Sequence, residues 1–306
     1  TAMPTTMGTP MCTDTATMTI EPLTAAQHQR LATWFGAGFP IGAFSYSHGL
    51  EAAFEAGLVG DRDGLAEWIE GLLLFGSGRN DAILFAAAYR SAPDVAAAAA
   101  LAAALSPSRE LRAETLNQGE AFLRAVRQGW PSVLPGPSPS SSSFPGRREA
   151  ASRDLPPLGT ETPDRASGAS GEAQRDGGPA GDARRECGAS GDARTEGGPG
   201  SSPGNTAPLA LPVAAGLCCA LAGIPLHASL LAYLHAFAAN IVSAALRSMP
   251  IGQSDGLAVQ GRVEAAVSEV AAAALTAGLD EIGAATPMLD WLSASHETQY
   301  SRLFRS

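Results

Sequence analysis

The sequence predicts an all-α fold, a single helical bundle of about nine or ten helices that is interrupted by a long disordered insertion. The apolar residues are mostly alanine and leucine, and this composition favours helix over strand. Apolar positions recur at helical spacing along most of the chain, and no stretch shows a convincing strand pattern. With 306 residues, 45% of them hydrophobic, the chain can form a sizeable core.

The first half of the helical domain, residues 23–131, follows an N-terminal extension at 1–22 that we expect to be disordered. Periodicity predicts helices over about 24–35, 45–57, 61–75, 80–89, 93–105 and 106–128. Gly57 stands where a left-handed cap would end the second of these. The candidate N-cap residues are Ser45 or Ser47, Asp61 or Asp63, Asn80 or Asp81, and Ser106, which precedes a proline at the first helical position.

Residues 132–207 have a different composition, rich in Pro, Gly, Ser, Ala, Arg and acidic residues. Large apolar side chains are almost absent, so the segment cannot bury enough surface to offset its ordering entropy. Residues 168–179 recur with few changes at 188–199, as a duplication that has no hydrophobic face to stack. We therefore predict a disordered insertion that the fold does not require.

The second half of the helical domain is predicted at residues 208–295. We expect helices over 209–222 and 226–248, a third from Ser254–Asp255 to about residue 277, and one or two short helices within 279–295. The 226–248 stretch has no charge before Arg247, and a membrane protein built on 209–248 is an alternative. Its two histidines, its asparagine and its missing basic flank favour a central helix of a bundle instead.

Composition also argues against several classes of function. The chain has no lysine, and both the P-loop and Schiff-base chemistry require one. The net charge of −10 argues against nucleic acid, because phosphate contacts need a basic surface. The cysteines have no CxxC spacing, so they indicate buried free thiols rather than a zinc site or disulfides; they are Cys12, Cys187, Cys218 and Cys219.

One group of residues suggests chemistry. His48, Glu51 and Glu55 are spaced to share one face of the predicted 45–57 helix, which would suit a metal site or an acid–base pair. Because no second ligand motif accompanies them, a solvated helix face is the simpler interpretation. A metal-dependent helical hydrolase is the alternative. No serine lies in a nucleophile motif, so the residues favour an interaction protein that has no catalytic group and no cofactor.

The stretch at 38–57 combines a turn with an unusual amount of apolar surface. Phe39, Ile41, Phe44 and Tyr46 crowd a glycine-rich turn that has no charge before Glu51. Apolar loops are rarely left in water. This turn therefore either packs into the core of the chain or meets another protein.

Three separated stretches together resemble the urease accessory protein UreF family. They are Phe-Pro-Ile-Gly-Ala-Phe-Ser-Tyr-Ser-His-Gly-Leu-Glu at 39–51, Met-Pro-Ile-Gly-Gln-Ser-Asp-Gly at 249–256, and His-Glu-Thr-Gln-Tyr-Ser-Arg-Leu-Phe-Arg-Ser at 296–306. The resemblance covers roughly 24–130 and 208–306. The insertion and the N-terminal extension depart from the family pattern.

The resemblance implies an all-helical, cytoplasmic, non-catalytic homodimer. It also implies binding to UreD (UreH), recruitment or regulation of the GTPase UreG, and delivery of nickel to the urease apoprotein. By position, residues 296–306 become a partner-binding tail that docks on UreD, and His48 is a weak candidate for a nickel contact. The expected partner-binding residues are Phe44, Tyr46, His48, Glu51, Gln253, His296, Glu297, Thr298, Gln299, Tyr300, Arg302, Leu303, Phe304 and Arg305.

Overall fold

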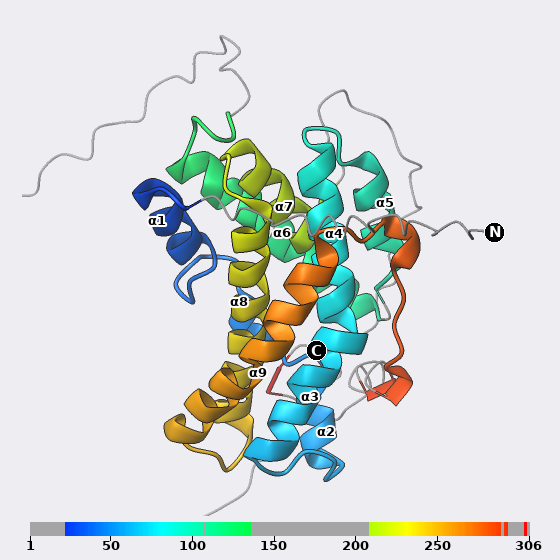
Figure 1. The fold of residues 1–306 in the computed structure, drawn as a ribbon. Helices are drawn as coiled ribbons and strands as arrows, with labels where there is room; N and C mark the ends of the chain where they lie inside the picture. Colours follow the sequence, from blue (N-terminus) through cyan, green and yellow to red (C-terminus); the bar gives the residue numbers. More distant parts are fainter. Residues whose placement is uncertain (1–21, 107, 136–207, 289–290, 293–302, 305–306) are drawn as a thin grey trace, which may run out of the picture. The chain divides into compact units, whose positions relative to one another are not determined.

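The computed structural model describes residues 22–106, 108–135, 208–288, 291–292 and 303–304. Within these residues lie nine α-helices, two short 3-10 helices and no strand, so the predicted all-α fold is confirmed (Figure 1). The chain divides into two units, one formed by 1–138 together with 206–306 and the other by 139–205. All of the described residues belong to the first unit, and its two halves pack into a single helical bundle.

The helices follow one another with short connections on either side of the predicted insertion. The first half contains α1 (Ala25–Trp34), α2 (Leu50–Glu55), α3 (Arg62–Phe75), α4 (Ser77–Ser91), α5 (Ala96–Ala104) and α6 (Arg109–Gly129). The second half contains α7 (Leu211–Leu221), α8 (Leu226–Ser248) and α9 (Gln253–Ala274). The 3-10 helices are η1 (Ala43–Ser45), before α2, and η2 (Leu279–Glu281), after α9.

Polar side chains begin three of these helices. The Thr24 hydroxyl accepts the Gln27 amide at 3.2 Å, and the Gln27 side chain accepts the Thr24 amide at 2.8 Å, so α1 begins with a capping box. Asp61 accepts the amide of Gly64 at 2.9 Å and caps α3, which confirms one of the two predicted candidates. The α6 cap is Ser108, whose hydroxyl accepts the amide of Leu111 at 3.1 Å.

Five predicted helix starts are wrong, the first being that of α5, which begins at Ala96 rather than at residue 93. Helix α6 begins after Ser108, two residues beyond the predicted cap, Ser106. Helix α4 begins at Ser77, directly after Gly76, so Asn80 and Asp81 lie inside it. Glycines occupy the other two N-cap positions. Gly49 precedes α2 in a left-handed conformation (φ 76°), in place of Ser45 or Ser47, and Gly252 precedes α9.

Helix α8 packs most extensively against α9 and also contacts α2, α3, α4 and α7. Helix α9 packs along α8 and α3, while α7 packs against both α4 and α6 (Figure 1). The core therefore combines residues from both halves of the sequence. Its largest fully buried side chains are Trp34, Phe85, Phe122, Leu50, Leu65, Ile69, Leu73, Ile83, Ile224, Leu230, Leu234 and Ile241.

Helix α7 approaches its neighbours at backbone distance. A Cβ atom added to Gly216 would overlap the carbonyl oxygen of Phe85 on α4, and one added to Gly119 on α6 would overlap that of Leu209. Only glycine permits so close an approach. Cys218 and Cys219 on the same helix are buried, and burial raises the pKa of both thiols. Both therefore stay protonated, and neither is a reactive thiolate at neutral pH.

Helix α8 passes the length and hydropathy test for a membrane span, as no other helix in the described ranges does. Half of its apolar window is buried inside the protein, and buried core helices commonly pass the same test. Leu230, Leu234 and Ile241 are fully buried on it. The structure therefore favours the central-helix interpretation of 226–248.

Candidate partner-binding site

Stretches that lie far apart in the sequence meet around Phe304. The carboxylate of Glu51, on α2, accepts the amide of Leu303 at 2.7 Å and the amide of Phe304 at 3.1 Å. The guanidinium of Arg247, in the last turn of α8, lies 4.6 Å from the centre of the Phe304 ring. The 249–256 motif continues directly from that turn into α9. The fold thus brings the first motif and the tail together, beside the start of the second motif.

The backbone before α2 determines which way Glu51 points. Gly42, His48 and Gly49 all have positive φ, so the chain turns sharply twice before the helix begins. The helix has only six residues, and Leu50 and Ala53 anchor it in the core. Glu51 is itself 7% exposed. A glutamate in this position needs hydrogen-bond donors, and the tail amides supply two of them.

His48 occupies the wall between α2, α6 and α8. Its ring lies 5.0 Å from that of Phe237, and its Nε2 lies 3.8 Å from an Oε1 atom of Glu114. Gln118 donates to the same oxygen at 2.8 Å. Burial lowers the pKa of His48 to about 4. The imidazole is therefore neutral at pH 7, and its approach to Glu114 is a polar contact rather than an ion pair.

The predicted shared face of His48, Glu51 and Glu55 is wrong. His48 precedes α2 and has a left-handed backbone (φ 51°), so helical spacing does not apply to it. Its side chain faces Glu114, Glu51 binds the tail amides, and Glu55 is exposed. Across the described part of the chain, no three His, Cys, Asp or Glu side chains are grouped closely enough to hold a metal ion. The geometry thus gives no support to the hydrolase alternative.

The other predicted partner-binding residues differ widely in exposure. Phe44 is 66% exposed and Leu303 is 63% exposed, whereas Tyr46 and Phe304 are buried. Gln253 is exposed as the first residue of α9. The remaining tail residues lie outside the described ranges; they are His296, Glu297, Thr298, Gln299, Tyr300, Arg302 and Arg305.

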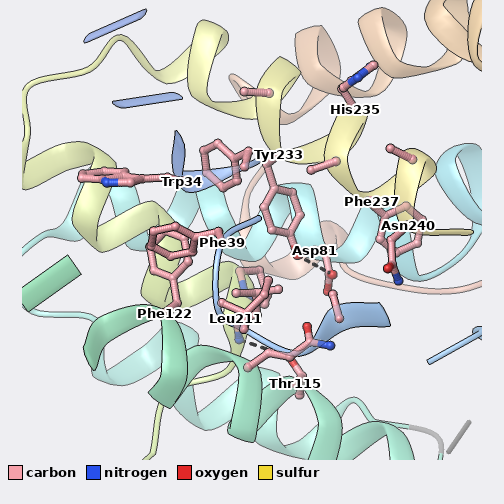
Figure 2. A pocket seen from close by; sticks show the side chains of 18 of the residues that line it. Trp34, Phe39, Asp81, Thr115, Phe122, Leu211, Tyr233, His235, Phe237 and Asn240 are labelled. Atoms are coloured by element: carbon pink, nitrogen blue, oxygen red, sulfur yellow. Dashed lines mark hydrogen bonds between the residues drawn. The ribbon is translucent and has the colours of Figure 1, made fainter. Parts of the chain in front are cut away.

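A large cavity lies beside α8, with a volume of about 1340 Å³. Figure 2 shows Trp34, Phe39 and Phe122 gathered on one side and Phe237 on the other. Ring contacts link the first group, with centroid distances of 6.0 Å from Trp34 to Phe122 and 5.1 Å from Phe39 to Phe122. The cavity exceeds the roughly 300–1,000 Å³ of ordinary small-molecule sites. Most of its lining side chains are apolar.

One buried polar pair lines this cavity. The hydroxyl of Tyr233, on α8, donates to Oδ2 of Asp81, on α4, at 2.8 Å (Figure 2). Burial raises the pKa of Asp81 to about 7, and the hydrogen bond from Tyr233 offsets part of the rise. The carboxyl therefore holds its proton to a much higher pH than an exposed aspartate does.

Sequence reasoning missed the residues that complete these contacts. Arg247 had a visible signal, because it is the only charged residue on α8. Asp81 had a weaker one, as an acid next to an apolar run in α4. Glu114 had none, since it lies among other polar residues on α6. Its role depends on which face of α6 meets the turn before α2.

Comparisons with known proteins give one consistent result. Residues 59–264 match the protein-family model UreF. A urease accessory protein UreF from Azorhizobium caulinodans is 39% identical over 281 residues, covering 90% of this chain and 94% of the relative. Proteins of the same name from Rhodopseudomonas palustris and Methylorubrum populi are 36% and 37% identical, covering 94% and 90% of this chain and 96% and 98% of their own lengths.

Proposed function

This chain belongs to the urease accessory protein UreF family, and we propose that it is a non-catalytic maturation factor for urease. In this proposal it binds UreD (UreH), recruits or regulates the GTPase UreG, and assists nickel delivery to the urease apoprotein in the cytoplasm. The observation that supports it best is the contact of Glu51 with the tail amides. That contact joins two of the three stretches that resemble the family.

The chemistry of the described residues suits a scaffold rather than a catalyst. The buried acids, Glu51, Asp81 and Glu114, accept hydrogen bonds from within the chain. His48 is neutral at pH 7 and is held between Glu114 and Phe237. Exposed apolar side chains, by contrast, lie on the turn before α2 and on the tail. Phe44 and Leu303 are two of several large apolar side chains that the described residues expose, and we propose that a partner covers these two.

Deletion of residues 296–306 tests the partner-binding role. We expect the truncated chain to lose UreD in a pull-down and to leave urease inactive in cells, because the deletion removes the tail that the resemblance assigns to UreD. The control is Leu221→Ala, which removes an exposed leucine at the C-terminal end of α7. Undiminished UreD binding by a truncated chain that retains its helical circular dichroism would refute the tail assignment.

We propose further that the chain forms a homodimer, as the resemblance implies. One face of α8 is apolar and only half covered, and it borders the large cavity through Leu231, Ala232 and Ala236. A second copy of the chain is the occupant that we propose for this face. Light scattering of the purified chain should give the mass of two chains. The mass of one chain at micromolar concentration would contradict the proposal.

A further inference from the structure

We propose that Glu51 and Arg247 act as positioning residues that hold the tail on its own chain, with Phe304 as an internal anchor and Leu303 facing the partner. The contact within the chain stands independently of the proposed function. Only the role of Leu303 in binding a partner rests on that function. It divides the predicted partner-binding residues into two groups. Glu51 and Phe304 form a contact within the chain, whereas Leu303 remains available to a partner.

The Glu51 carboxylate fixes the direction of the tail backbone. Its Oε1 accepts the amide of Leu303 and its Oε2 accepts that of Phe304, so each oxygen binds one of two consecutive amides. Two hydrogen bonds to one side chain fix the direction of the backbone more narrowly than a single bond would. With the two amides held on one carboxylate, the side chains of Leu303 and Phe304 differ sharply in exposure, at 63% and 4%.

Arg247 covers the anchor. Its guanidinium lies over the Phe304 ring at 4.6 Å from the centroid, a distance at which a cation and an aromatic face attract each other. Its Nε also donates to the Ser243 carbonyl at 3.0 Å, one turn earlier in α8, which restricts the side chain to this direction. Arg247 is the only charge on α8, so its place beside the tail accounts for a cation on an otherwise uncharged helix.

The partner surface that follows from this arrangement is small and apolar. Leu303 extends from the docked backbone into solvent. We therefore infer a partner with an apolar pocket that accepts Leu303 once Glu51 and Arg247 have positioned the tail. A tail that is already held in place loses less conformational entropy on binding than a free segment would.

Hydrogen exchange of the free, full-length chain tests the positioning contact without any partner. The C-terminal peptide from pepsin digestion reports the amides of Leu303 and Phe304. We expect Glu51→Ala to speed their exchange at least about tenfold, because both acceptors are lost. Glu51→Gln, which keeps one acceptor oxygen, should have a smaller effect. Glu55→Gln, on the exposed side of the same helix, is the matched control and should leave the exchange unchanged. Unchanged exchange in Glu51→Ala would overturn the inference.

Binding to UreD then tests the positioning role. We expect Glu51→Ala and Arg247→Leu each to weaken UreD binding at least about tenfold. Glu51 is buried, so its effect on binding would act through the position of the tail. Arg247→Lys keeps the positive charge and should retain part of the affinity. Leu303→Asp should weaken binding while the two amides remain protected. If Glu51→Ala frees the amides but binds UreD as tightly as the unmodified chain, the positioning role is wrong. If the unmodified chain does not bind UreD, the proposed function fails, and the exchange measurement still decides whether the contact exists.

Discussion

Two of the contacts that join distant parts of this chain are built in opposite ways. Helix α7 meets α4 and α6 through glycines, so that the backbones themselves touch near Phe85 and Leu209. The tail meets α2 and α8 through long side chains, those of Glu51 and Arg247. The first contact is tight and apolar and cannot accept another atom. The second consists of two hydrogen bonds to the buried Glu51 and the contact of Arg247 with the buried Phe304 ring.

The difference indicates that the stability of the fold and the binding of a partner depend on different contacts. Contacts at backbone distance depend on shape, and protein interiors resist any change of volume. Side-chain contacts at the surface of the bundle depend on charge and orientation, and they permit local opening at lower free energy. We therefore expect changes in the α7 contact to affect the whole fold, and changes around the tail to affect partner binding.

The largest expected effect is that of Gly216→Ala. The new methyl group would overlap the Phe85 carbonyl, so α7 and α4 must separate. We expect the free energy of unfolding to fall by about 3 kcal/mol or more in urea denaturation. Gly261→Ala is the control, because the added Cβ on α9 meets only open space. Its expected effect is a gain of up to about 1 kcal/mol in helix stability. Equal stability of the two variants would remove the distinction between the two contacts.

A medium effect is expected at Asp81, a polar contact inside the bundle. Its folded pKa of about 7 lies above its ordinary value of 3.8, because burial disfavours the carboxylate. The part of the free energy of unfolding that depends on Asp81 is therefore highest below pH 4. It declines as the pH rises toward 7 and reaches its minimum above pH 8. We expect the free energy of unfolding to fall by a few kcal/mol over this range, measured by denaturation at several pH values.

Asp81→Asn should abolish that part of the pH dependence, because the amide does not ionise but can still accept from Tyr233. Tyr233→Phe should move the decline to higher pH, since it removes the hydrogen bond that favours the carboxylate. A pH profile that is the same in Asp81→Asn and in the unmodified chain would show that other groups cause the decline.

The smallest effect is expected for Arg262 on α9. It lies within 3.2 Å of Glu70, 3.7 Å of Asp63 and 3.9 Å of Glu67, all on α3, and it is itself 40% exposed. Exposed ion pairs contribute little, because water and salt screen them. We expect Arg262→Ala to change Tm by no more than about 2 °C, and by even less in 0.5 M salt. A larger shift in Tm that persists in high salt would show that these ion pairs stabilise the fold to an extent comparable with the α7 contact.

The sequence was sufficient for the helices but not for the side-chain contacts around them. Apolar periodicity predicted 226–248 as one helix, and α8 spans Leu226–Ser248. It failed at α4, because the predicted helices leave a gap at 76–79, which contains Gly76 and Gly78. The chain passes from α3 to α4 through Gly76 alone, and Gly78 packs tightly against Leu73 inside the new helix. A glycine that allows close packing and a glycine that ends a helix have the same signature in one sequence.

The site was predicted only as a set of stretches. The family resemblance placed Glu51 and the tail in the same functional group, and the structure shows that the two are in contact. Local spacing alone led to the wrong expectation for His48, because a left-handed residue before a helix does not continue its periodicity. The contact between Glu51 and Phe304 joins residues 253 positions apart. No local pattern encodes such a separation, since it depends on how every helix between the two packs.

The place of α7 also affects the synthesis of the protein. Helices α4 and α6 emerge from the ribosome first, yet the helix that packs against both of them comes after residue 207. Translation of residues 136–207 takes roughly 4–15 s at ordinary rates of 5–20 residues per second. Throughout that interval the nascent first half must wait with the apolar surface that α7 later covers still unpaired. We therefore expect the nascent chain to be most prone to aggregation in this interval, before α7 covers that surface.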